Sequence, residues 1–242
     1  MSFITNLFKK NDDIQSTNGF LSDNTPDTKL IEYKISLNKT VVNLEKSTGV
    51  SFDNLKSRVN LVLDYSSSMD GMYTDGTVQE VVTKILPLAL KFDDNGELDC
   101  YLFSNSFKKV KGCTEHNYHN YVKEVIKPNI DNMHGTYYAP VLRNILNHDK
   151  SDIPTFTIFI TDGDNSDPAM TDDIIRQYST ANGFIMFVGI GGAEFWYLRR
   201  LDTLDGRAVD NTGFVEFTNI RNVDETTLYE KLLSEYASWL RR

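Results

Sequence analysis

The sequence predicts an α/β fold in which a mostly parallel β-sheet is covered by helices on both faces. From residue 59 to the end of the chain, continuous apolar runs alternate with amphipathic segments. This alternation of strand and helix patterns is typical of doubly wound sheets. The chain has 242 residues, of which 40% are hydrophobic, and this suffices for one full-sized core with some chain left over.

The apolar and amphipathic runs locate the individual elements. Strands are expected at 59–63, 98–103, 156–160, 184–190 and 214–217, and helices at 78–92, 118–126, 141–146, 172–181, 195–201 and 228–240. Within the first of these helices, Pro87 is expected to kink the helix or to end its first part. Parallel sheets bind ligands beyond the carboxyl ends of their strands, and Asp64 and Asp162 each follow such an end.

The first part of the chain lacks this alternation. Residues 11–30 are rich in Asn, Asp, Ser and Thr, without apolar periodicity, so residues 1–30 are expected to form a flexible polar leader. The chain shows neither a basic start followed by an apolar run nor the roughly 20 apolar residues that would span a bilayer. A cytoplasmic location is therefore expected.

Charge and cysteine content narrow the class of partner. The chain carries 34 acidic and 25 basic residues, a net charge of -9, which disfavours nucleic acid and anionic membrane surfaces as partners. Its two cysteines, Cys100 and Cys113, are too few for a disulfide framework and are expected to be buried free thiols.

Two glycine-rich stretches resemble nucleotide-binding motifs but lack essential residues. Residues 71–77 have the spacing of a phosphate-binding loop, yet Thr77 replaces the lysine and Asp75 would repel phosphates. Residues 189–194 begin like a dinucleotide fingerprint, but Glu194 stands where the third glycine belongs. The second stretch is more simply explained as a tight turn between a strand and a helix.

A set of oxygen-bearing side chains is the strongest candidate site. Asp64, Ser66 and Ser68 follow the first strand, Asp162 follows the strand at 156–160, and Thr136 lies in a loop between them. No cluster of His or Cys accompanies them, so the set suits Mg²⁺, or Mn²⁺ or Ca²⁺, over Zn²⁺. Taken singly, each piece could be a helix cap or a turn.

Together these residues closely resemble the metal-ion-dependent adhesion site (MIDAS) of von Willebrand factor A (vWA) domains. That family has Asp-x-Ser-x-Ser after the first strand, a Thr in a mid-chain loop and an Asp after the fourth strand, and the five residues match it without departure. The resemblance covers about 59–242. The sequences of residues 86–90, 159–166 and 201–207 are similar to those of the vWA domain in bacterial tellurium-resistance and general stress proteins.

The resemblance implies a Rossmann-like vWA fold with three layers. Its doubly wound sheet would have six strands, one of them an antiparallel edge strand, for which 107–110 is the best candidate. Residues 31–58 would form a lead-in segment that packs on the core, and residues 59–242 would form the vWA domain itself.

The resemblance also implies a metal-dependent protein-binding module. Ser66 and Ser68 would bind the ion directly, Asp64 and Asp162 would act partly through bound waters, and Thr136 would join as the ligand binds. A partner's Asp or Glu carboxylate would complete the coordination, in a bacterial tellurite or general stress response.

The alternative is a Mg²⁺-dependent enzyme for phosphoryl transfer or hydrolysis. Haloacid-dehalogenase phosphatases need a second carboxylate where this chain has Ser66, and Ser66 lacks the glycines and the base of a serine nucleophile. Only His134 lies near a motif residue. No enzymatic activity and no catalytic residues are therefore expected.

Overall fold

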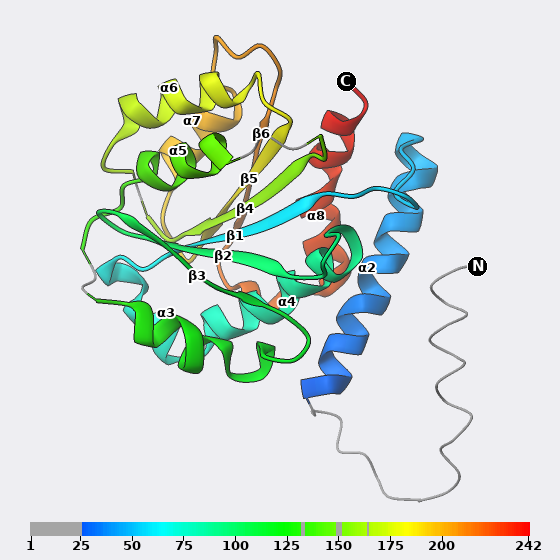
Figure 1. Ribbon diagram of the computed structural model, residues 1–242, viewed down its shortest axis with the longest axis horizontal. Coiled ribbons are helices and arrows are strands. Elements are labelled where there is room, and N and C mark those ends of the chain that lie inside the picture. The colour runs from blue at the N-terminus through cyan, green and yellow to red at the C-terminus, as the bar shows by residue number, and fades with distance from the viewer. Residues whose placement is uncertain (1–25, 132–133, 149–151, 164) are drawn as a thin grey trace, which may run out of the picture.

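The computed structural model describes residues 26–131, 134–148, 152–163 and 165–242. A six-stranded sheet in the order β3-β2-β1-β4-β5-β6 forms the centre of the molecule (Figure 1). All neighbouring strands are parallel except β3, which pairs antiparallel with β2 at the edge. The predicted α/β fold, with its antiparallel edge strand, is thereby confirmed. The strands are β1 (Arg58–Asp64), β2 (Leu98–Phe103), β3 (Phe107–Cys113), β4 (Thr155–Thr161), β5 (Gly183–Ile190) and β6 (Thr212–Phe217).

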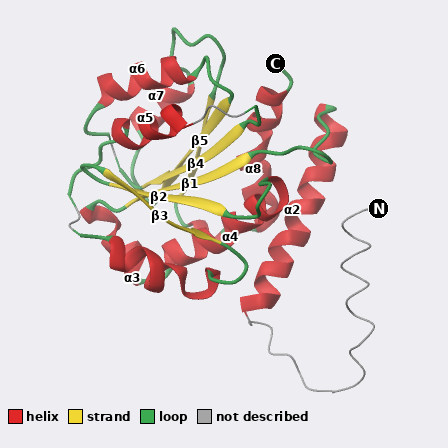
Figure 2. Cartoon of the chain, in the orientation of Figure 1, coloured by secondary structure: helices red, strands yellow, loops and turns green. Residues whose placement is uncertain are grey.

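Helices cover both faces of this sheet (Figure 2). One apolar cluster joins the sheet to α2, α4 and α8, and a second joins it to α5, α6 and α7. The helices are α2 (Pro26–Thr48), α3 (Asp70–Thr74), α4 (Thr77–Phe92), α5 (Ala139–His148), α6 (Pro168–Tyr178), α7 (Trp196–Asp202) and α8 (Glu225–Leu240). Shorter helical turns are η1 (Ser67–Met69), η2 (Tyr118–Asn120), η3 (Val122–Ile126), η4 (Lys127–Asn129) and η5 (Ile220–Asn222).

The central strand β1 shows why the sheet has two cores. Its side chains alternate, so that Leu61 and Leu63 join the cluster under α4 and α8 while Val62 joins the cluster under α5. A strand buried on both faces reads as a continuous apolar run. This is the signal by which the sequence predicted the strand.

Two helices differ from the expectation. Helix α4 is continuous from Thr77 to Phe92, so Pro87 does not end it. Buried side chains on both sides of Pro87 hold this helix on the core. The helix expected at 118–126 is instead a succession of short turns, η2 to η4, with Pro128 in the last of them.

The first described helix, α2, begins at Pro26, so the boundary expected for the polar leader is wrong. Residues 26–30 of that leader belong to this helix, and the remaining residues, 1–25, lie outside the described part of the chain. Leu30, Tyr33, Leu37 and Val41 are buried on its inner face, which lies beside α8 (Figure 1). Of the described residues, none forms a helix long and apolar enough to cross a membrane.

Candidate metal centre

The candidate centre begins where β1 ends. Asp64 is the last residue of the strand, and Ser66 and Ser68 lie on the turn that follows it. The Met69 backbone N–H donates to the Ser66 carbonyl oxygen at 3.0 Å, and the Met69 side chain is fully buried. The turn is thus anchored to the core, and Ser68 lies exposed on it.

Asp64 is fully buried and held from several directions. Its Oδ1 accepts a hydrogen bond from the Ser66 backbone N–H at 2.7 Å, and its Oδ2 accepts one from Thr161 Oγ1 at 2.6 Å. The Tyr73 hydroxyl donates to the Asp64 carbonyl oxygen at 2.8 Å. The first two bonds fix the plane and the direction of the carboxylate, and the third holds the backbone of Asp64.

The electrostatics of Asp64 reflect its burial. Burial raises the pKa of the Asp64 carboxyl to about 6, the nearby Asp162 charge adds to this, and the hydrogen bonds from Ser66 and Thr161 oppose it. Burial likewise raises the pKa of Asp162, partly offset by the hydrogen bond from Ser68. A bound cation would favour the ionised form of both groups.

A row of oxygen atoms runs from the turn after β1 to the end of β4. Ser66 Oγ lies 3.1 Å from Ser68 Oγ, and Ser68 Oγ donates to Asp162 Oδ1 at 2.8 Å. Neighbouring oxygens of an octahedral Mg²⁺ are about 3 Å apart, because each lies about 2.1 Å from the ion. The donors are therefore of the kind and the spacing that a hard divalent cation requires.

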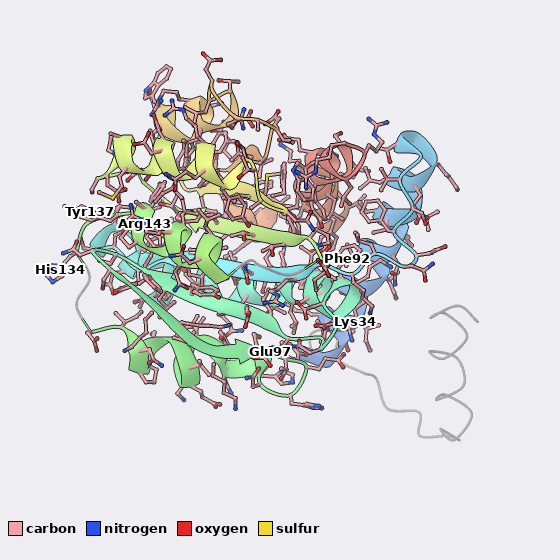
Figure 3. The ribbon with its side chains drawn as sticks, turned by 45° about the horizontal axis from the view of Figure 1, so that its top comes forward. Lys34, Phe92, Glu97, His134, Tyr137 and Arg143 are labelled. Carbon is pink, nitrogen blue, oxygen red and sulfur yellow. The ribbon has the colours of Figure 1, made fainter. Side chains whose placement is uncertain are left out.

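Thr136 lies on the adjoining loop before α5. Its backbone N–H donates to Ser166 Oγ at 3.3 Å, and the Ser166 backbone N–H donates to its carbonyl oxygen at 2.8 Å. The Tyr137 backbone N–H donates to the Ser104 carbonyl oxygen at 2.9 Å. The loop is thus held between the segments that follow β2 and β4, and its His134 and Tyr137 lie together at one end of the molecule (Figure 3).

Of the predicted site residues, four form one hydrogen-bonded group. Asp64 bonds to Ser66, Ser66 contacts Ser68, and Ser68 bonds to Asp162. Thr136 is joined to this group through its backbone, which bonds to Ser166. Ser166 lies four residues after Asp162 on the loop that follows β4.

Three residues that support the centre were not predicted from the sequence. Thr161 and Tyr73 hold Asp64, and Asp167 accepts hydrogen bonds from the backbone N–H groups of Tyr138 (3.0 Å) and Ala139 (3.1 Å). Asp167 thereby ties the Thr136 loop to the segment after β4. Thr161 could have been found from its place at the strand end beside Asp162, whereas nothing in the sequence indicates where the Tyr73 hydroxyl points.

The chemistry of the donor set suits some metals and not others. Among the described residues, no three His, Cys, Asp or Glu side chains cluster in a way that could hold a metal ion. Hydroxyls from Ser66 and Ser68 with the carboxylates of Asp64 and Asp162 fit Mg²⁺, Mn²⁺ or Ca²⁺, which favour oxygen ligands. They do not fit the nitrogen and sulfur preference of a structural Zn²⁺ site.

Comparisons with known proteins place this geometry in a family context. The sequence pattern of the vWA-TerF-like family, described as the vWA found in the TerF C terminus, matches residues 56–242. The chain is 40% identical over 192 residues to a Bacillus subtilis (strain 168) protein, "Uncharacterized protein YcbR", covering 76% of this chain and 78% of that protein.

Two solved structures share the fold. Proximal thread matrix protein 1 from the mussel byssus is 16% identical with a TM-score of 0.55, and the match covers 76% of this chain and 48% of that chain. BatB from Bacteroides thetaiotaomicron is 14% identical with a TM-score of 0.52, and the match covers 75% of this chain and 99% of that chain. At these identities, the likeness concerns the fold alone.

Proposed function

The chain belongs to the vWA-TerF-like family, and we propose that it is a metal-dependent module that binds an acidic group of a protein partner. Domains of the vWA type are usually protein-interaction modules. The observation that carries the proposal is the row of oxygens from Ser66 through Ser68 to Asp162, beside the buried carboxylate of Asp64.

In this proposal, the ion is Mg²⁺, with Mn²⁺ or Ca²⁺ as alternatives. Ser66, Ser68 and Asp162 would hold it, and Asp64 would act through water, since both of its oxygens already accept hydrogen bonds from the protein. When bound, the ion supplies a positive centre with a coordination position left for a ligand. Thr136, on its separate loop, would be recruited as a partner carboxylate binds.

The charge around the centre supports a role for the metal as a gate. Asp70 and Asp75 are exposed on the segment that follows the serines, and Asp162 and Asp167 are partly exposed on the facing loop. Asp164, which the sequence also places there, lies outside the described residues. Without a cation this negative charge would repel an acidic partner, and with a cation it would help to retain the ion.

A binding role is favoured over a catalytic one by the state of the candidate nucleophile. A nucleophilic Asp needs a free carboxylate oxygen beside the substrate, but Asp64 Oδ1 and Oδ2 both accept hydrogen bonds. His134 is exposed, and its backbone N–H donates to Ser104 Oγ at 3.2 Å. We therefore propose no turnover of phosphate esters, nucleotides or peptides.

The proposed setting is a bacterial tellurite or general stress response in the cytoplasm. Membership of the vWA-TerF-like family supports the first part. The two cysteines, Cys100 and Cys113, are both free and buried, which suits a reducing compartment.

Affinity capture tests the proposal. The purified chain would be presented to an extract of its native cells with Mg²⁺ or with a chelator, as wild type, as Asp64→Ala and as the surface control Asp173→Ala. We expect one protein to be captured by wild type and by Asp173→Ala with metal only, and replacement of a single Asp or Glu in that protein to abolish capture.

Two outcomes would contradict the proposal. The first is capture that persists both in chelator and in folded Asp64→Ala. The second is phosphatase or ATPase turnover that Asp64→Ala abolishes while the far-ultraviolet circular dichroism spectrum is unchanged.

A further inference from the structure

Helix α2 carries a second apolar surface, on the side that faces away from the sheet. Ile31, Ile35 and Val42 of this helix are each between 42% and 49% exposed. At 100° per residue, these three side chains lie within an arc of about 40° and extend over about 16 Å of the helix. They form one narrow row, which we call the outer stripe of α2.

The outer stripe stands out from the rest of the surface. Six large apolar side chains are exposed in the part of the chain that the structure describes, and three of them form this stripe. The opposite side of α2, with Leu30 and Leu37, is already buried in the cluster that includes α4 and α8. Figure 1 shows α2 at the outer edge of the molecule, with the sheet and the other helices on its inner side. A helix that is apolar on two sides is typical of one that packs against two neighbours.

The charges beside the outer stripe change sign along the helix. Glu32 and Lys39 are both exposed and lie on the same flank of the stripe, Glu32 near its first residue and Lys39 near its last. Lys46 lies beyond the stripe, in the last turn of the helix. On the other flank, Lys34 is paired with Glu115. The first flank is therefore acidic toward one end of the stripe and basic toward the other.

A second copy of α2 that runs antiparallel complements both the apolar and the charged pattern. When Ile31 of one copy lies against Val42 of the other, the two-fold axis passes between residues 36 and 37, and both Ile35 side chains lie close to it. The same flanks of two antiparallel helices face each other. Glu32 of each copy then lies within about 3 Å, along the helix axis, of Lys39 of the other.

A parallel arrangement matches less well. In a parallel pair, opposite flanks of the two helices would meet, and Glu32 would face Lys34 of the other copy. The charge of Lys34 is already balanced by Glu115 of the same chain. The pattern of charges therefore favours the antiparallel pair.

We propose that α2 forms the interface of a symmetric dimer of this chain. The outer stripes of the two copies pack against each other antiparallel, and Glu32 of each copy pairs with Lys39 of the other. A two-fold contact uses the same surface on both copies and is closed, so association stops at the dimer. Because each copy contributes one helix, the interface is small, and we expect a dissociation constant of about 10–100 µM.

Sedimentation equilibrium of the whole chain tests this proposal. The protein would be measured from about 5 to about 500 µM, a range that brackets the expected dissociation constant. A chelator would be present throughout, so that a metal ion cannot join two copies through their acidic residues. We expect the wild-type chain to convert from monomer to dimer over this range, without larger species.

A first pair of variants assigns the contact to the outer stripe. Ile35→Glu places a carboxylate from each copy close to the two-fold axis, and it should weaken dimerisation at least about tenfold. Met170→Glu is the matched control, because Met170 is also an apolar residue with 49% exposure but lies on α6, which packs on the other face of the sheet. It should leave the dissociation constant unchanged.

A charge exchange tests the antiparallel register. Glu32→Lys alone and Lys39→Glu alone each replace two attractive pairs in the dimer by two repulsive ones, and each should weaken dimerisation about fivefold. An equimolar mixture of these two variants should dimerise about as well as wild type, because each mixed dimer again pairs Lys with Glu on both sides of the axis. Recovery in the mixture requires contact between two chains, so it separates the proposed interface from an effect within one chain.

Any of three results would overturn the proposal. The first is a wild-type chain that stays monomeric up to about 500 µM, which is the result expected if another segment or another protein covers the stripe. The second is a dimer that Ile35→Glu leaves unchanged, since that dimer would use another surface. The third is a mixture of Glu32→Lys and Lys39→Glu that dimerises no better than either variant alone. All of these substitutions are at exposed positions, and circular dichroism would verify that each variant is folded.

Discussion

Asp64 and Asn60 are two buried polar side chains of the same strand, and their surroundings differ. Both oxygens of Asp64 accept hydrogen bonds from the protein, whereas Asn60 Oδ1 has no partner among the described residues. Asp64 lies at the end of β1, where the turn after it and the end of β4 can supply donors. Asn60 lies in the middle of the strand, where neighbouring backbone N–H groups are committed to the sheet.

Position along a strand therefore decides what a buried polar group can do. At the strand end, the protein itself orients the group, so that it is prepared for a cation. In the strand interior, the protein leaves one buried oxygen without a hydrogen-bond donor, which costs stability. The following changes test the two halves of this comparison.

Replacing Asp64 should have the largest effect. Asp64→Ala removes the buried carboxylate and leaves Thr161 Oγ1 and the Ser66 N–H without their acceptor. We expect the affinity for Mg²⁺ to fall about 100-fold, in line with the loss of a group that orients metal ligands. Calorimetry would measure this, with Asp173→Ala as the control. An unchanged affinity in folded Asp64→Ala would show that Asp64 plays no part in metal binding.

Removing one hydrogen-bond donor to Asp64 should also lower the affinity for Mg²⁺, but by less. Thr161→Val keeps the side-chain shape but removes the hydroxyl that donates to Asp64 Oδ2. We expect an affinity loss of about tenfold and a decrease in the free energy of unfolding of about 1–3 kcal/mol, because a buried carboxylate oxygen loses its partner. Urea denaturation would measure the latter. Equal stability of variant and wild type would mean that this oxygen finds another donor.

Removing the polar group of Asn60 should change the free energy of unfolding in the opposite direction. Asn60→Leu removes the unsatisfied Oδ1 together with one long hydrogen bond to Thr157. We expect the free energy of unfolding to rise by up to about 1 kcal/mol, with no change in the affinity for Mg²⁺. The same denaturation experiment measures it. A destabilisation as large as that of Thr161→Val would mean that Asn60 is satisfied in the free protein.

The smallest expected effect concerns Glu235, far from both groups in the sequence. All the influences on its carboxyl raise its pKa. Burial, followed by the charges of Asp202 and Asp210, raises its pKa from 4.5 to about 7. The folded state therefore binds more protons than the unfolded state between these values. The stability that Glu235 contributes is complete below about pH 4.5 and is lost as the pH rises through about 7.

Glu235→Gln should remove this part of the pH dependence. Since the side chain is only half-buried, we expect the variant to gain no more than about 1 kcal/mol over wild type at alkaline pH. Denaturation at pH 5 and pH 8 would measure the difference. A gain that is equal at both pH values would show that the titration of Glu235 is not its cause.

The sheet was predictable because its central strands are apolar on both faces, as in Leu61 to Leu63 and Phe156 to Ile160. Helix α2 was missed, although Leu30, Tyr33, Leu37 and Val41 have helical spacing. Ile31, Ile35 and Val42 lie among these four but are exposed, so apolar residues occur on both sides of the helix. The buried face is recognisable only once α8 is in place.

The candidate site was predictable to the extent that it follows strand ends. Asp64, Ser66, Ser68 and Asp162 lie beside the carboxyl ends of β1 and β4, which are neighbours in the sheet. The bond from Tyr73 was not predictable, because it depends on the direction of α3. The missing partner of Asn60 Oδ1 was likewise not predictable, because it depends on which donors the neighbouring strands bring near it.

Metal titration of a double serine variant tests the central claim most directly. Calorimetry of the wild-type chain with Mg²⁺ and with Mn²⁺ should show one site, and that site should be absent from folded Ser66→Ala/Ser68→Ala, because the two hydroxyls contact each other and Asp162 in the row of donors. Saturable binding of the same affinity in the double variant would contradict the assignment of the metal centre.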